Sequence, residues 1–280
     1  MNVLSPLCRG AGRPGKFIPV FFLLFCTTVY PQEIFRGAVP LSLGGCYVTE
    51  SRGAWAGGNE GSLGFTPHPS LAMEHWQPFI VADVSVSGVS GTAKLPPGFL
   101  GLSLQTWGIT GYHRTALQAA YGMKLGEDFS AGVGFRCDLV SAAGELAYQW
   151  RLAVSLGVLY RAGEKLTLGA HLSDPLSVSG SRSPLSALPS SLALGLNWAT
   201  TPGLLLCMQL SYGTVPGLRL SLGTEWQVSE RIRLRAGYGS NPSTPSMGLS
   251  VGYGKWELQL ALPWITGLGL SPAAGLTRTF

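Results

Sequence analysis

The feature that most constrains the fold is a two-residue period of apolar side chains. In RLSLGTEWQVSERIRLRAGY, Arg219 to Tyr238, nearly every even position is apolar or aromatic, and nearly every odd position is polar, charged or glycine. This alternation is typical of β-strands, whose successive side chains point to opposite faces. A helix would spread the same apolar residues around its whole circumference and leave no face to bury. The pattern therefore predicts an all-β fold.

The length of the alternating runs separates two kinds of β-protein. Strands of soluble sandwiches are mostly about five or six residues long, whereas a tilted strand needs roughly nine to eleven residues to cross a bilayer. Runs of the longer kind recur here, in a chain with 39 glycines and 12% charged residues. The sequence predicts a transmembrane up-and-down antiparallel β-barrel of about 14 strands, with 12 as the alternative because the first two strands are weakly patterned.

The spacing between runs sets a register. Paired residues point to the same face, so the outward positions of neighbouring strands fix whether a loop is odd or even. Five hairpins satisfy this rule, through the loops GED (126–128), RAGEK (161–165), ATTPG (199–203), SER (229–231) and GK (254–255). The alternate connections are mostly longer, including Ser173 to Pro189. Short periplasmic turns and longer external loops are typical of outer-membrane barrels.

The beginning and the end of the sequence predict a location. Arg9, Arg13 and Lys16 precede an apolar run from Phe17 to about Val29, which indicates a secretory signal; a single membrane anchor is the alternative, for which the run is short. We expect a signal peptide over 1–31 with an open cleavage site, a lumen or plug segment over 32–69, and the barrel over 70–280. Phe280, an aromatic residue after an alternating strand, resembles the signal read by the barrel assembly machinery. The expected location is the outer membrane of a Gram-negative cell, with outer-membrane lipid and that machinery as partners.

The charges of the chain argue against a nucleic-acid partner. Residues 1–31 hold three of the 19 basic residues and no acidic one, so their removal lowers the formal net charge from +5 to +2. The remaining basic residues alternate with apolar ones and form no patch.

Charged residues of the barrel fall on the inward-facing positions. They are Arg114, Arg136, Asp138, Arg219, Glu225, Arg233, Arg235 and Glu257. One interpretation is a wall of ion pairs that braces the plug, and the other is a basic constriction that attracts anionic solutes. If Val228 pairs with Ile232, then Glu225 and Arg235 are cross-strand partners.

No sequence pattern indicates catalysis, a metal or a cofactor. The four histidines are scattered, and Cys46, Cys137 and Cys207 have no metal-like spacing, so we expect the cysteines to be packing residues. A barrel-embedded lipid hydrolase stays a remote alternative, because serine and histidine can meet across strands without a sequence signature.

One glycine-rich stretch, Gly37 to Phe65, lacks alternation and precedes the first strand. It contains Gly44-Gly45-Cys46-Tyr47-Val48, then Ala54-Trp55 and Asn59-Glu60-Gly61-Ser62-Leu63. These residues resemble the N-terminal signature of FadL-like barrels, most closely the PorV and PorQ group associated with type IX secretion. Cys46 and Glu60-Gly61 depart from that signature. The resemblance implies a 14-stranded barrel with a plug that includes Gly44, Gly45, Tyr47, Val48, Trp55 and Asn59.

Two functions follow as hypotheses. The first is a secretion-associated or structural barrel, whose partners would be secretion-system components or secreted cargo docked at the long loop. The second is a FadL-like transporter in which the plug gates passage of a hydrophobic or amphipathic molecule.

Overall fold

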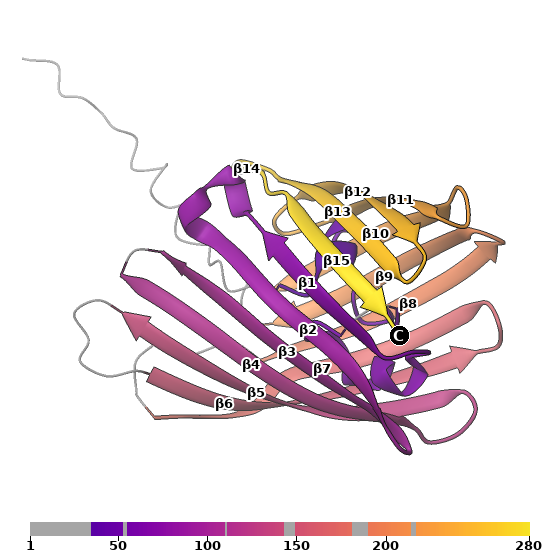
Figure 1. Ribbon diagram of the computed structural model, residues 1–280, viewed down its shortest axis with the longest axis horizontal. Coiled ribbons are helices and arrows are strands. Elements are labelled where there is room, and N and C mark those ends of the chain that lie inside the picture. The colour runs from indigo at the N-terminus through magenta and orange to yellow at the C-terminus, as the bar shows by residue number, and fades with distance from the viewer. Residues whose placement is uncertain (1–34, 53–54, 110, 143–148, 181–189, 214–216) are drawn as a thin grey trace, which may run out of the picture. The chain divides into compact units, whose positions relative to one another are not determined.

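The chain folds into a closed antiparallel β-barrel of fourteen strands, with one short extra strand (Figure 1). The computed structural model describes residues 35–52, 55–109, 111–142, 149–180, 190–213 and 217–280. The predicted signal peptide lies outside these residues. The prediction of about fourteen strands is confirmed, and the alternative of twelve is wrong.

The barrel strands follow one another around the ring in chain order. They are β1 (Ser70–Trp76), β2 (Ser85–Leu95), β3 (Gly98–Ile109), β4 (Tyr112–Lys124), β5 (Phe129–Ala142), β6 (Gln149–Ala162), β7 (Leu166–Ser179), β8 (Ser191–Thr201), β9 (Leu204–Gly213), β10 (Leu218–Gln227), β11 (Ile232–Gly239), β12 (Thr244–Tyr253), β13 (Trp256–Ile265) and β15 (Ala273–Thr279). β15 closes the ring between β13 and β1, and the short β14 (Gly269–Leu270) pairs with the end of β13.

The two faces of the wall differ as the alternation predicts. On β8, Leu192, Leu194 and Trp198 are each about half exposed on the outer face, whereas Ala193 between them is 1% exposed. An apolar outer face suits contact with lipid acyl chains. No helix among the described residues is long and apolar enough to cross a membrane.

Three of the five predicted hairpin registers are confirmed and two are shifted. The backbone of Leu125 bonds to Phe129, that of Val228 bonds to Ile232, and Tyr253 pairs with Trp256. The loop after β6 is shorter than predicted, because the strand continues to Ala162 and pairs with Leu166. The loop after β8 is shortened by an irregularity between Ala199 and Thr201. In both cases outward residues still face outward, which is the property that the apolar pattern enforces.

Two predicted boundaries are wrong. The second strand begins at Ser85 rather than near Ala82, because the short helical turns η3 (Pro78–Ile80) and η4 (Ala82–Val84) precede it. β7 extends to Ser179, so the predicted loop Ser173 to Pro189 is largely strand where it is described. A bulge between Val154 and Leu156 shifts the register opposite Asp174, whose φ is 54°. This bulge interrupts the period of two. For that reason the sequence pattern predicted a loop here instead of a strand.

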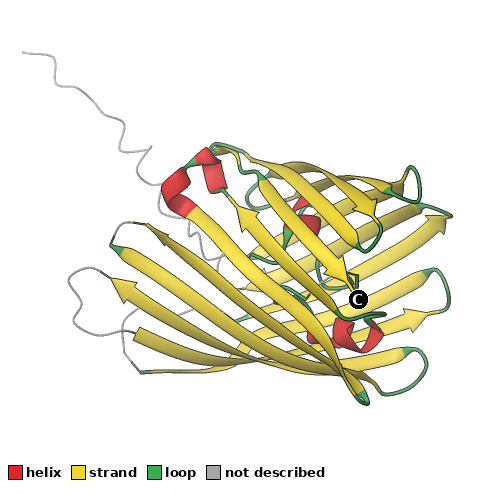
Figure 2. Cartoon of the chain, viewed as in Figure 1, coloured by secondary structure: helices red, strands yellow, loops and turns green. Residues whose placement is uncertain are grey.

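Residues 35–52 and 55–66 form a segment inside the barrel, which we call the plug. It contains the helix α2 (Ala38–Ser42) and the helical turn η2 (Glu60–Phe65), drawn in red in Figure 2. Its first residue, Phe35, packs against Trp76 at the end of β1 that leads into the longer connections. The turn η2 lies against β4, β5 and β6 near the opposite end of the barrel, where the short turns are.

Glycines on the inner face of the wall let the plug backbone approach closely. A Cβ added to Gly132 would lie 2.5 Å from the carbonyl oxygen of Glu60, and one added to Gly61 of the plug would lie 2.8 Å from Val158. Gly122, Gly157, Gly169, Gly195, Gly223, Gly237 and Gly248 are likewise crowded by plug atoms. The high glycine content of the strands therefore makes room for a second layer of chain inside the barrel.

Candidate functional site: the plug and its anchors

Asn59 is the most fully bonded anchor of the plug and is completely buried. Its side-chain nitrogen donates to the carbonyl oxygens of Val48, at 2.8 Å, and of Val158, at 3.0 Å. Its side-chain oxygen accepts from the backbone nitrogen of Gly61 and so caps the turn η2. The same nitrogen also donates to the carbonyl oxygen of Ala170 on β7, at 3.3 Å, so one side chain joins two parts of the plug to strands β6 and β7.

Glu60 and His171 form a second anchor, between η2 and β7. The Nε2 atom of His171 lies 3.1 Å from Oε2 of Glu60, and both side chains are 2% exposed. The Ser155 hydroxyl donates to the other carboxylate oxygen. The other ring nitrogen of His171, Nδ1, lies 3.0 Å from the hydroxyl oxygen of Tyr47. Arg36 stacks over the Tyr47 ring at 3.7 Å, so the cluster connects both ends of the plug.

Arg52 and Glu225 form a third anchor, between the plug and β10. Arg52 Nη1 lies 2.5 Å from Glu225 Oε1, and Arg235 Nε lies 2.6 Å from Glu225 Oε2. Glu50 and then Glu225 hold the pKa of Arg52 above its usual range, so it stays charged. Arg235 also donates to Ser250. The predicted cross-strand pairing of Glu225 with Arg235 is confirmed.

The other predicted lumen charges are also held in contacts. Arg114 and Arg136 both reach Oδ1 of Asp138, at 2.9 and 3.0 Å. Arg233 pairs with Glu257, and Arg219 donates to the carbonyl oxygen of Gly44 in the plug at 3.3 Å. This arrangement matches the interpretation of a wall of ion pairs rather than an open basic constriction.

Two cavities adjoin the plug. A cavity of about 50 Å³ lies between the plug and the wall around Arg36, Pro40, Glu74 and Gln259. A larger one, of about 720 Å³, opens among the short turns at Asp128, Lys165 and Gly203 and is floored by residues Thr49 to Arg52. Sites for drug-sized molecules are usually about 300 to 1,000 Å³. The inner cavity is therefore too small for such a molecule while the plug is in place.

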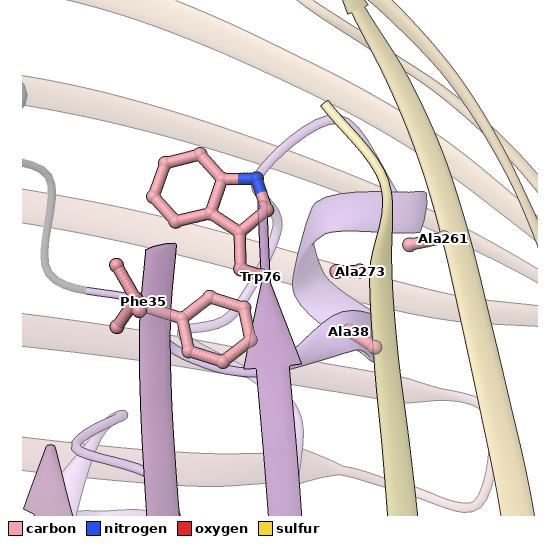
Figure 3. Packing of buried hydrophobic residues seen from close by; sticks show 6 residues of the cluster. Phe35, Ala38, Trp76, Ala261 and Ala273 are labelled. Carbon is pink, nitrogen blue, oxygen red and sulfur yellow. The ribbon is translucent and has the colours of Figure 1, made fainter. Parts of the chain in front are cut away.

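An apolar cluster occupies the lumen at the start of the plug (Figure 3). The rings of Phe35 and Trp76 stack with centroids 5.7 Å apart, and Ala38, Ala261 and Ala273 complete the cluster with Val86. The indole nitrogen of Trp76 donates to the carbonyl oxygen of Ser271. Partly buried Leu41 and Trp107 pack against its edge. The cluster is an apolar patch in a lumen lined mainly by polar side chains.

The structure brings the predicted signature residues together within the plug. Gly44, Tyr47, Val48, Trp55 and Asn59 are buried, and Gly45 is partly buried; Ala54 lies outside the described residues. Phe280 is half exposed, and its backbone nitrogen donates to the carbonyl oxygen of Pro69.

Sequence reasoning did not identify the anchoring roles of Glu60, Arg36 and Arg52. A carboxylate at Glu60 within a glycine-rich apolar stretch was the available signal, because a buried carboxylate requires a partner.

The contact of Ser173, His171 and Glu60 superficially resembles a hydrolase triad. The Ser173 hydroxyl lies 3.2 Å from Nδ1 of His171. Neither of the two cavities described above is lined by any of these residues, and all three are at most 4% exposed. In the described part of the chain these three buried residues connect the plug to the wall.

The Glu225 anchor gives a prediction. Glu225→Gln is expected to lower the stability of the plugged barrel by about 3 to 5 kcal/mol, because it leaves the buried Arg235 without its counter-ion. The temperature at which unboiled purified protein loses its compact gel migration should fall, and trypsin should cleave after Arg52 in the folded barrel.

The matched control for this prediction is Glu257→Gln. That carboxylate is about a quarter exposed and bonds to Arg233 and Gln259 of the barrel wall, so a change of about 0 to 1 kcal/mol is expected. Equal effects of the two substitutions would contradict the role of Glu225 as an anchor.

No protein-family model and no curated protein matches the sequence. Solved structures do match. The toluene transporter TodX of Pseudomonas putida is 12% identical, with a TM-score of 0.61 over 86% of this chain and 96% of that one. A TodX mutant described as a monoaromatic hydrocarbon channel is 13% identical, with a TM-score of 0.60 over 87% and 99%.

A FadL homologue of Pseudomonas aeruginosa matches similarly. It is 10% identical, with a TM-score of 0.58 over 86% of this chain and 95% of that one. These matches cover most of both chains. The chain has the fold of the FadL-type outer-membrane barrels.

Proposed function

We propose that this protein is an outer-membrane channel for hydrophobic or amphipathic small molecules, and that the plug is its gate. The fold is that of barrels described as a toluene transporter and a monoaromatic hydrocarbon channel. This reading has more support than the secretion-associated barrel of PorV or PorQ type. Of the residues that resemble the PorV and PorQ signature, Tyr47 and Asn59 anchor the plug, so the resemblance supports the plugged fold and identifies no cargo.

The observation that carries the proposal is the apolar cluster around Phe35 and Trp76. It lies inside the barrel at the end of the longer connections. Burial of apolar surface there is worth about 25 cal/mol per Å². An apolar solute that took the place of the Phe35 ring against Trp76 would recover that energy. Binding of the solute would thus be coupled to release of the first residues of the plug.

The cavity volumes support the proposed role of the plug as a gate. The inner cavity of about 50 Å³ holds no such solute, so passage requires the plug to move. Beyond the plug, the cavity of about 720 Å³ would receive the solute on the side of the short turns. Those turns are expected to face the periplasm, so transport would run inward from the cell surface.

Uptake by whole cells tests the proposal. The protein would be expressed in a Gram-negative strain that lacks its own hydrocarbon channel, and uptake of labelled toluene and of a long-chain fatty acid would be measured. We expect uptake several-fold above the empty vector, and a return towards that background for Trp76→Gln. Trp226→Gln is the control, because Trp226 is exposed on the outer face of β10. Background uptake by cells whose protein is folded in the outer membrane would contradict the proposal.

A second candidate, the secretion-associated or structural barrel, is favoured by one observation. The plug is held by several buried polar anchors and leaves an inner cavity of about 50 Å³, which suits a permanently closed barrel that displays a partner. A deletion strain in the native host separates the two. Lost surface proteins with unchanged hydrocarbon uptake would support this candidate, and the reverse would support the channel.

A further inference from the structure

Two cysteines that are far apart in the sequence meet between the plug and the wall. Cys46 lies in the plug between Gly45 and Tyr47, and Cys207 lies on the inner face of β9. The side chains are 4% and 5% exposed and pack together beside Leu43. In this structure both are free cysteines that share one buried cluster.

A glycine in the neighbouring strand leaves room for the Cys207 sulfur. Gly223 on β10 is paired with Cys207, and a Cβ added there would lie 2.5 Å from the Cys207 sulfur. Cys46 stands where the plug signature that this chain resembles has a small residue. Cys137 contrasts with both. It is paired on β5 with Leu117 and Leu152, which are about half exposed on the outer face.

We propose that Cys46 and Cys207 form a disulfide that fastens the plug to strand β9. The proposal rests on the proposed function for its location outside the reducing cytoplasm, where disulfides persist. A bond at this point would hold the middle of the plug in the lumen. Opening of the gate would then be a local movement, such as displacement of Phe35 from Trp76, and not expulsion of the whole plug.

The oxidation requires a disulfide-bearing oxidant, and the periplasm supplies oxidants of that class. One cysteine thiolate attacks the oxidant disulfide and forms a mixed disulfide, and one oxidant thiol is released. The second cysteine then attacks the mixed disulfide, forms the Cys46–Cys207 bond and releases the other oxidant thiol. The two electrons from the protein reduce the oxidant disulfide to a dithiol, which also takes up the two protons.

Both cysteine side chains are buried in the closed barrel, so an external thiol or oxidant would reach them only when the plug loosens. Contact with Cys207 and burial raise the pKa of the Cys46 thiol, although nearby Arg219 opposes this effect, so thiolate is scarce while the pair is buried and reduced. The bond is therefore expected to form before the plug docks, while the unfolded chain crosses the periplasm.

Peptide mapping of the native protein is the decisive experiment. Outer membranes would be dissolved in denaturant with N-ethylmaleimide and no reductant, and the protein digested for mass spectrometry. We expect a crosslinked peptide pair containing Cys46 and Cys207 in most of the protein, and an alkylated Cys137. Alkylation of Cys46, Cys137 and Cys207 in most of the protein would overturn the proposal. The measurement needs no transport, so its outcome is independent of the uptake assay.

Conductance of purified protein in planar bilayers tests the consequence. In moderate urea, the wild type and Cys137→Ala should stay closed until a reductant is added, and then show a several-fold rise in open events. Cys46→Ala should show that rise without reductant. If reductant leaves the wild type unchanged in urea while Cys46→Ala is already open, the bond is absent. If Cys46→Ala does not assemble, the comparison of wild type with and without reductant still decides.

Discussion

Asn59→Ala is expected to open the barrel to ions and to molecules that the intact outer membrane excludes. The substitution leaves the carbonyl oxygens of Val48 and Val158 and the backbone nitrogen of Gly61 without the partner that Asn59 provides. An unsatisfied buried group costs about 1 to 3 kcal/mol. Val158 also pairs with both neighbouring strands, so the loss falls mainly on the two plug groups, the Val48 oxygen and the Gly61 nitrogen, and makes the docked plug less stable by on the order of 2 to 6 kcal/mol by the same rule.

The expected readout is a rise in conductance of at least several-fold in planar bilayers, together with sensitivity of expressing cells to a large antibiotic such as vancomycin. The barrel itself should still assemble, because Asn59 contributes no hydrogen bond to the strand ladders. Compact migration of unboiled protein would establish this. The prediction therefore separates docking of the plug from formation of the wall.

Two variants make the test specific. Asn59→Asp keeps an oxygen that accepts from Gly61 but loses both donors to carbonyl groups, so it should also open the barrel. Asn197→Ala is the matched control, because Asn197 is a lumen-facing amide whose contact with the plug is one long bond of 3.5 Å to Thr49. Equal conductance of the Asn59 and Asn197 variants would contradict the special role of Asn59.

The barrel wall was predictable from sequence because each strand shows its own alternation of apolar and polar side chains. The alternation on β8 or β10 is local, and lipid outside with a polar lumen inside enforces it at nearly every position. Register followed from the same rule, since a one-residue slip would expose Arg233 and Arg235 to lipid. The rule failed at Asp174, where a bulge allows the face to change within a continuous strand.

The plug was less predictable because its contacts are not local. The signature residues Tyr47 and Asn59 allowed the plug segment to be located in the sequence. Nothing near Glu60 in the sequence indicates Ser155 or His171, however, which lie on strands β6 and β7. The prediction that Cys46 and Cys207 are packing residues is confirmed, since both are free and buried in one cluster. Their contact with each other was not predicted for the same reason, because only the closed ring brings β9 against the plug.

The inner-face glycines carry information that their sequence pattern does not reveal. A glycine at an inward position could equally mark an empty lumen or one packed with chain. Gly132 and Gly252 occupy equivalent inward positions of β5 and β12, but only Gly132 of this pair faces the plug closely. This difference leads to the second prediction of large effect.

Gly132→Ala is expected to undock the turn η2 without preventing barrel assembly. The new methyl group would lie 2.5 Å from the carbonyl oxygen of Glu60 and 2.8 Å from its Cβ atom, so the plug backbone must move. Movement of Glu60 disturbs its contacts with Ser155 and His171 and the neighbouring bonds of Asn59. Overpacking of this kind costs about 1 to 3 kcal/mol before those losses are included.

Gly237→Ala should act in the same way at the other end of the plug, where the methyl group would meet the backbone of Leu43 and Gly44. Gly252→Ala is the control, because the nearest atom to its new methyl group lies at 3.7 Å, an ordinary contact. For each variant, trypsin cleavage after Arg52 in the folded, unboiled protein and conductance in bilayers would be measured. We expect cleavage and conductance to rise several-fold for Gly132→Ala and Gly237→Ala and to stay at the wild-type level for Gly252→Ala. Uniform behaviour of the three variants would mean that these glycines serve strand curvature and not the plug.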